Sequence, residues 1–219
     1  MKVSTRSVEW HTSGSAVKIV VVARAAPPVL EWSIDATTTY TFSSTGGVNI
    51  CVKGKPRGIN FPATLARVGL TMSLAPGMEQ VTWFGRGPGE SYRDKKLSQL
   101  FGKYTRSVDE LWTEYEFPQE SGNRTDVRWV TVSDGKAGGA SMTARFGKQE
   151  GFSFQASHYH TEDVDRAQHP FELHKKKKTE TILRLDAMHH GLGTGSCGPK
   201  TLNDYALKSG PFEFEVDLE

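Results

Sequence analysis

The histidines of the segment His158-Tyr159-His160 are candidates for chemistry, because imidazole binds metal ions and transfers protons near neutral pH. Two residues apart on a strand, His158 and His160 would point to the same side. The sequence offers no third ligand at a recognisable spacing. We therefore interpret the pair as histidines at a strand end and predict no metal site.

The glycine-rich segment of residues 188–199 contains two further candidates, because Ser196 and Cys197 carry nucleophilic side chains. His189 and His190 lie nearby in the sequence, but their spacing assigns neither as the base that a catalytic thiol needs. The glycines also suggest a phosphate-binding loop, yet a dinucleotide site needs a following helix, which this segment does not begin. We predict no catalytic residue here.

Paired carboxylates could act as acid and nucleophile in glycoside hydrolysis, where a retaining enzyme holds them about 5 Å apart. Glu114, Glu116 and Glu120 cluster in the sequence, but nothing in their spacing predicts that separation, so we interpret them as solvent-facing or structural. Asn123 and Arg124 follow in a segment rich in hydrogen-bonding groups. We expect them to shape this loop, Arg124 through a bidentate contact to a loop carboxylate and Asn123 through its own backbone; a sugar contact is the alternative.

Composition narrows the class of protein. The chain has 219 residues, with 27 Lys and Arg against 25 Asp and Glu, and this balance gives no reason to expect nucleic acid or a membrane surface as partner. No apolar run reaches the length of a transmembrane helix, and the first residues do not resemble a signal peptide. Cys51 and Cys197 stand in unlike contexts, so we expect no disulfide and a soluble, cytoplasmic protein. The lysines of residues 175–178 are interpreted as a solvated turn.

Alternation of apolar and polar residues, interrupted by glycine and proline, predicts an all-β fold of antiparallel strands. The strands are expected at residues 18–24, 33–42, 48–53, 67–74, 126–133, 141–146, 151–159, 179–188 and 212–219. The only helix expected has Thr161 as its N-cap and runs toward Gln168. Many short strands in a chain of this length indicate a sandwich or a barrel in a single domain, residues 1–219.

Three ordered segments carry a family resemblance: WFGRGPGESYRDK (83–95), YEFPQESGNRTDVRW (115–129) and HHGLGTGSCGP (189–199). Together they resemble the carboxy-terminal or small-chain domain of family-two β-galactosidases, over a region from about Lys18 to the end. The resemblance implies a large antiparallel β-sandwich of the galactose-mutarotase-like type, in an enzyme that cleaves terminal β-galactosides such as lactose. Family members usually have further strands upstream, so we expect an amino-terminally incomplete sandwich that lacks its first strands and leaves a sheet edge open.

The resemblance also implies where the chemistry lies. In this family the catalytic acid and nucleophile are glutamates of a separate barrel domain, so none of the catalytic residues is expected in this chain. The implied partners are that barrel, as a domain or a large chain, and a galactoside substrate, in an enzyme that could be an oligomer. The magnesium and sodium sites of the family lie chiefly outside the matched region, and no cofactor is expected here.

One substrate contact follows from the resemblance. Many bacterial members place a tryptophan at the mouth of the active site, where this chain, like fungal-type members, has Cys197; a thiol offers less stacking area than an indole. Ser196 would add a polar contact. Gly193, Gly195 and Gly198 would let the loop approach a partner surface with unusual backbone angles. The alternative is a glycine-rich connection that only closes the sandwich.

A second class of function stays open, because fold alone does not settle function. The chain could be an independent mutarotase-like sugar epimerase or a carbohydrate-binding module. An epimerase needs a general acid and base at one sugar, which would have to come from His158, His160 or His190 with a nearby glutamate. An inactive remnant of the enzyme is a third interpretation.

Overall fold

The computed structural model describes residues 1–147, 151–195 and 197–219, which separate into two compact units. The first unit contains residues 1–65 and 207–219, with the end of strand β10 (Ser141–Arg145). The second contains residues 66–143 and the described residues between 151 and 206. Each unit is built on antiparallel strands, which confirms the all-β prediction.

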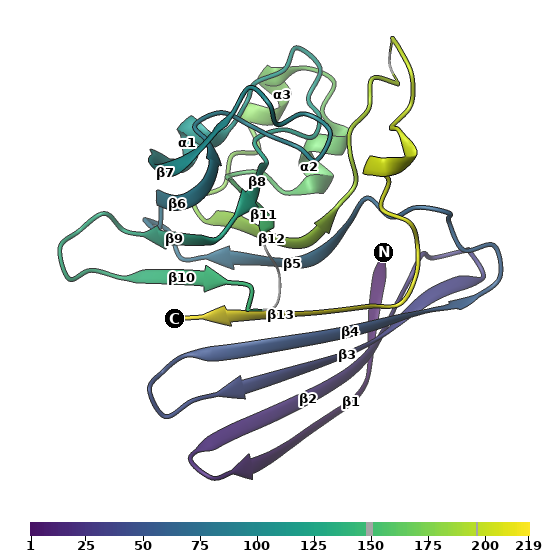
Figure 1. The fold of residues 1–219 in the computed structure, drawn as a ribbon, viewed down its shortest axis with the longest axis vertical. Coiled ribbons are helices and arrows are strands. Elements are labelled where there is room, and N and C mark those ends of the chain that lie inside the picture. The colour runs from purple at the N-terminus through teal and green to yellow at the C-terminus, as the bar shows by residue number, and fades with distance from the viewer. Residues whose placement is uncertain (148–150, 196) are drawn as a thin grey trace. The chain divides into compact units, whose positions relative to one another are not determined.

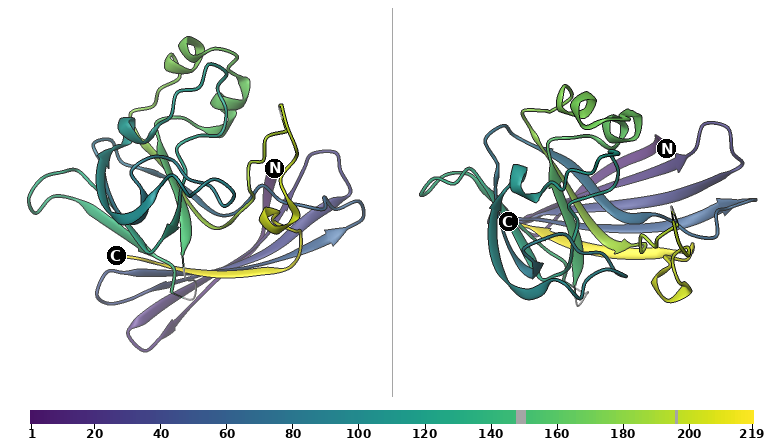
Figure 2. Two further views of the ribbon diagram at one scale, coloured as in Figure 1. Left: turned by 45° about the horizontal axis from the view of Figure 1, so that its top comes forward. Right: turned by 90° about the horizontal axis from the view of Figure 1, so that it is seen from above.

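A long antiparallel meander forms the first unit. Its strands, in spatial order, are β1 (Lys2–Ser13), β2 (Ala16–Ala26), β3 (Trp32–Phe42), β4 (Val48–Gly58) and β13 (Phe212–Leu218). Figure 1 shows the carboxy-terminal strand β13 beside β4, and the two views of Figure 2 show the twist of these strands. The apolar run of residues 18–24 lies in β2, between β1 and β3, and is confirmed as an interior strand.

Strand β1 was not expected from the sequence. It pairs with β2 from Lys2 opposite Ala26 to Ser13 opposite Ala16. Val8 and Trp10 of β1 are 60% and 71% exposed. Because nearly the whole strand is exposed, no buried face imposes the alternation by which a strand is recognised.

The second unit is a sandwich of two sheets. One sheet has the order β9-β6-β7 and the other β5-β12-β11-β8. The strands are β5 (Arg67–Leu74), β6 (Gln80–Gly87), β7 (Leu100–Ser107), β8 (Arg124–Val127), β9 (Trp129–Ser133), β11 (Phe152–Ser157) and β12 (Thr181–His189). Trp83 of β6 packs edge-on against Phe154 of β11 with ring centroids 5.6 Å apart, and both rings are fully buried. This inter-sheet core confirms the predicted sandwich.

Residues 126–133, expected as one strand, form two strands in different sheets. Asp126 adopts a left-handed φ of 56°, and the chain then passes from β8 to β9. At this point a Cβ added to Gly85 of β6 would lie 2.7 Å from the Cα of Val127. Glycine at position 85 therefore permits the close approach of β6 and β8 at which the chain changes sheet.

Helices are short: α1 (Val108–Leu111), α2 (Thr161–Arg166), α3 (Pro170–His174) and the 3-10 turn η1 (Asn203–Tyr205). The prediction of a single helix was wrong, because a capping box of Ser107 and Glu110 begins α1 and a proline begins α3. The predicted cap was also wrong: His160 is the N-cap of α2, and the Thr161 hydroxyl accepts a hydrogen bond from Arg184 instead. Over the described ranges, no helix is long and apolar enough to cross a membrane.

Candidate functional site

The first two sequence segments of the resemblance are joined by hydrogen bonds in the second unit. The backbone N–H of Ser91 donates to the carbonyl of Asn123 at 2.8 Å, and the Asn123 side-chain amide donates back to the Ser91 carbonyl at 2.7 Å. The N–H of Gly122 also donates to the Glu90 carboxylate at 2.8 Å. Asn123 thus binds a second loop, rather than its own backbone as expected.

Arg124 is the centre of this junction and is only 2% exposed. Its guanidinium donates to three carbonyl oxygens, those of Leu111 at 2.8 Å, Gly122 at 2.7 Å and Pro88 at 2.9 Å, and it lies over the ring of Trp83. The expected bidentate contact to a carboxylate is replaced by these carbonyls. Burial lowers the pKa of Arg124 to about 10, so the side chain remains charged at neutral pH.

Ion pairs connect the same two segments a second time. Arg86 donates to the Asp126 carboxylate at 2.6 Å, and the Lys96 ammonium lies 3.0 Å from it. Burial alone would raise the pKa of Asp126, but the hydrogen bonds from Arg86 and Lys96 outweigh burial and lower it. The first two segments that carry the resemblance are therefore joined by both hydrogen bonds and ion pairs.

The third segment is held to the first by Asp94. One carboxylate oxygen of Asp94 accepts from the N–H of Leu192 at 3.0 Å, and the other accepts from the N–H of Gly193 at 2.7 Å. Sequence reasoning did not single out Asp94. Its partners are main-chain N–H groups about a hundred residues away, and such groups give no signal in the sequence.

Cys197 lies at the tip of the loop that Asp94 holds. The N–H of Cys197 donates to the Thr194 carbonyl at 3.0 Å, and the Thr194 N–H donates to the Pro199 carbonyl at 3.0 Å, which forms a tight turn. The thiol of Cys197 is free and the residue is exposed. Ser196 lies outside the described residues.

The three glycines of this loop differ in what they permit. Gly193 has a left-handed φ of 66°, where glycine is favoured. Gly198 has an ordinary φ, but a Cβ added there would lie 2.7 Å from the Thr194 hydroxyl, and Gly195 has neither feature. The expected unusual backbone angles therefore occur at Gly193 and not at Gly195 or Gly198.

The histidines of residues 158–160 do not share one face of a strand. Strand β11 ends at Ser157; His158 is buried, with its Nδ1 3.1 Å from the Glu180 carbonyl, and His160 begins α2. Within residues 1–147, 151–195 and 197–219, no group of three or more His, Cys, Asp or Glu side chains is placed to hold a metal ion.

The three glutamates that cluster in the sequence, Glu114, Glu116 and Glu120, have different surroundings in the structure. Glu120 is bound by Arg67, and the Glu114 carboxylate lies 2.6 Å from His174. Glu116 is exposed. Glu114 and Glu120 therefore contact different basic side chains.

Arg67 also contacts a group of buried titratable side chains. It contacts Asp186 at 3.1 Å, and burial raises the pKa of this carboxyl to about 6 although Arg67 and Arg184 oppose the shift. His189, next to Glu120, is likewise buried, and burial lowers its pKa from 6.5 to about 4. The neutral imidazole is therefore the native form of His189 at neutral pH.

Replacing His189 by glutamine should change the pH dependence of stability. The unfolded chain binds a proton at His189 below pH 6.5 and the folded chain only near pH 4, so this residue stabilises the fold increasingly as pH rises through that window. The free energy of unfolding of the wild type, minus that of His189→Gln, should grow by about 1 kcal/mol per pH unit there. Urea denaturation at pH 4.5 and 6.5 measures it. If the difference in the free energy of unfolding does not change with pH, His189 is not a buried neutral imidazole. The raised pKa of Asp186 gives the opposite pH dependence, but both proteins contain Asp186, so its contribution cancels in the difference.

Residues 1–218 match the family described as "Beta galactosidase small chain". The chain belongs to the β-galactosidase small-chain family. This match begins at residue 1, whereas the resemblance seen in the sequence began at about Lys18.

The relatives that this chain matches are named β-galactosidases. The chain is 37% identical to the β-galactosidase of Kluyveromyces lactis over 213 residues, 97% of this chain and 20% of the relative. It is 29% identical to that of Staphylococcus xylosus over 213 residues, again 97% of this chain and 20% of the relative. It is 38% identical to that of Vibrio cholerae over 156 residues, 70% of this chain and 14% of the relative. The chain thus spans about a fifth or less of the length of these relatives.

Proposed function

We propose that this chain is the small-chain part of a β-galactosidase, which packs on a separate catalytic barrel to complete an enzyme that hydrolyses terminal β-D-galactosides such as lactose. The observation that carries the proposal is the family match over residues 1–218, together with β-galactosidases in which the corresponding segment is one fifth of the protein. The catalytic glutamates lie on the barrel. The separate structural contacts of Glu114 and Glu120 support this assignment.

In the completed enzyme, we place Cys197 against the bound galactoside, with Ser196 as a polar neighbour. The support is geometric: the loop is fixed at its base by two hydrogen bonds to Asp94, and the thiol at its tip is exposed. A small side chain on a fixed loop can define the edge of a sugar site without contributing to the chemistry. Gly193 and Gly198 permit the tight path of the loop, and Asn123 and Arg124 fix the structure that carries Asp94.

Strand β1 is a candidate contact for the barrel. Its Val8 and Trp10 side chains are exposed and apolar, and β1 is an edge strand of the first unit's meander. Exposed apolar side chains on an open sheet edge are typical of surfaces that a protein partner covers.

The first test of this proposal is whether the chain binds a fragment that contains the catalytic barrel. The chain is mixed with a fragment of the Kluyveromyces lactis β-galactosidase that lacks the segment matching this chain, and the mass of the mixture is measured by sedimentation velocity. We expect a complex, and we expect Trp10→Ser to weaken it more than Leu97→Ser, which removes an exposed apolar side chain of the second unit. Two separate species at every concentration, or galactose mutarotation by the chain alone, would contradict the proposal.

A further inference from the structure

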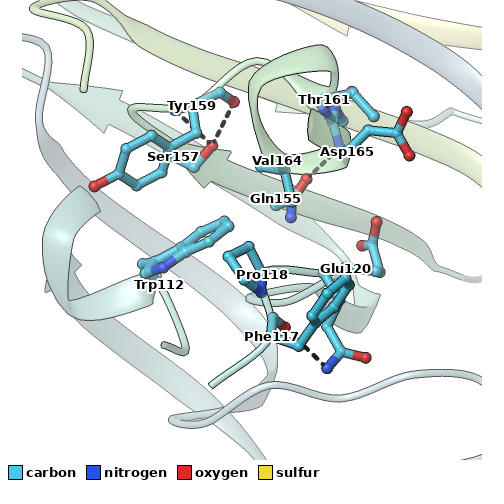
Figure 3. A pocket seen from close by; sticks show the side chains of 12 residues that line it. Trp112, Phe117, Pro118, Glu120, Gln155, Ser157, Tyr159, Thr161, Val164 and Asp165 are labelled. Carbon is cyan, nitrogen blue, oxygen red and sulfur yellow. Dashed lines mark hydrogen bonds between the residues drawn. The ribbon is translucent and has the colours of Figure 1, made fainter. Parts of the chain in front are cut away.

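A cavity of about 330 Å³ opens in the second unit between α2 and the segment of residues 117–120. In Figure 3, Trp112, Phe117 and Pro118 lie toward one side, and Thr161 and Asp165 of α2 lie toward the other. Its volume is at the lower end of the range of about 300–1,000 Å³ that is usual for sites of small ligands. Among the described residues of the loop at 189–199, none lines this cavity.

One wall of the cavity is aromatic. Trp112 is half-buried and fixed by the ring of Tyr159, with centroids 5.0 Å apart, whereas Phe117 is 61% exposed. Such rings offer a large apolar surface at low cost in conformational entropy, and the C–H face of a pyranose ring is apolar enough to pack on it.

The opposite and deeper surfaces are polar. Arg184 is only 7% exposed; it donates to the side-chain amide oxygen of Gln155 at 2.7 Å and to the Thr161 hydroxyl. These hydrogen bonds use two of the five N–H donors of a guanidinium. Asp165 is exposed on α2, and Glu120 lines the cavity with a carboxylate that is paired with Arg67.

The charges around the cavity favour a neutral ligand. The negative charges of Glu120 and Asp186 stabilise the positive charge of Arg184, and Arg67 forms ion pairs with the same two carboxylates. A phosphate would meet the carboxylates of Glu120 and Asp165, and a cation would meet the guanidinium of Arg184. Hydroxyl groups suit the site better, because each can donate to a carboxylate and accept from a guanidinium.

We propose that this cavity is a binding site for a neutral saccharide, with one hexopyranose ring packed on Trp112 and Phe117 and its hydroxyls bonded by Arg184, Glu120 and Asp165. The site is formed by this chain's own residues. The inference goes beyond the proposed part in β-galactoside hydrolysis and does not depend on it.

Titration of the ¹⁵N-labelled chain with D-galactose, and separately with lactose, tests this site. The indole N–H signal of Trp112 should shift saturably, with a Kd on the order of 1 mM for so small a ligand. Phe117→Ala and Asp165→Ala should each weaken binding about fivefold, because one removes ring contact and the other a hydrogen-bond acceptor. Both residues are exposed, so these variants should fold. A similar Kd for the two sugars would indicate recognition of a single ring, and tighter binding of lactose would extend the site to a disaccharide.

Matched controls distinguish this site from general surface effects. Asp204→Ala, on η1, and Phe171→Ala, on α3, remove exposed side chains that do not line the cavity, and they should leave the Kd unchanged. No saturable shift with either sugar would overturn the proposal, as would equal weakening by the controls. Because binding is measured on the chain alone, this failure is distinguishable from failure to complete a barrel fragment.

Discussion

Replacing Arg124 by methionine should lower the free energy of unfolding by about 3 kcal/mol. Methionine fills much of the same volume but leaves the carbonyls of Leu111, Gly122 and Pro88 without the guanidinium that now binds them. Buried acceptors that lose a charged partner cost about 1–3 kcal/mol each, and relief from burying the charge offsets part of that loss. Urea denaturation followed by tryptophan fluorescence measures the change.

Arg106→Met is the matched control for Arg124→Met. Arg106 is an exposed arginine of β7, and its replacement should change the free energy of unfolding by less than about 0.5 kcal/mol. If the two variants have the same free energy of unfolding, the hydrogen bonds of Arg124 to Leu111, Gly122 and Pro88 do not stabilise the fold.

Replacing Asp94 by alanine should reduce kcat/KM of the barrel-complemented enzyme about tenfold, and it should do so by loosening the Cys197 loop. The carboxylate fixes two consecutive N–H groups, those of Leu192 and Gly193. A displacement of the loop by about 1 Å can misalign a bound substrate enough to lower the rate by about this factor. The assay is hydrolysis of a chromogenic β-galactoside by the mixture of chains.

Two further variants decide whether the effect of Asp94→Ala comes from the loop. Asp94→Asn keeps one side-chain acceptor and should retain more activity than Asp94→Ala. Asp204→Ala removes an exposed carboxylate of η1 and should have wild-type activity. If Asp94→Ala associates with the barrel normally and is fully active, the loop does not orient the galactoside.

In several strands with one buried face, the strand could be predicted from the alternation of apolar and polar residues. In β5, Val68, Leu70 and Met72 share the inward face, and in β13 Phe214 and Val216 do so, as the alternation indicated. Strand β6 was missed because Gly85 and Gly87 look like loop residues. Both are strand residues at close approaches, where an added Cβ would lie 2.7 Å from Val127 or Tyr104.

The site was predicted less completely than the fold. The sequence indicated that Asn123 and Arg124 belong to a shaped loop, but two of the three carbonyls that Arg124 binds, those of Leu111 and Pro88, come from other segments of the chain. Asp94 was missed for the same reason, since its partners lie about a hundred residues away. Main-chain acceptors and donors carry no residue-type signal, so tertiary contacts of this kind cannot be read from composition or spacing.

Hydrolysis of a chromogenic β-galactoside, by the chain alone, by the barrel fragment alone and by their mixture, tests the central claim most directly. We expect activity only in the mixture, because we propose that the catalytic glutamates lie on the barrel and that this chain completes the pocket. Cys197→Trp in the mixture should alter KM more than the stability of the complex, since an indole offers a larger surface to the sugar. Hydrolysis by the chain alone would contradict the account, and so would a barrel fragment whose activity does not change when the chain is added.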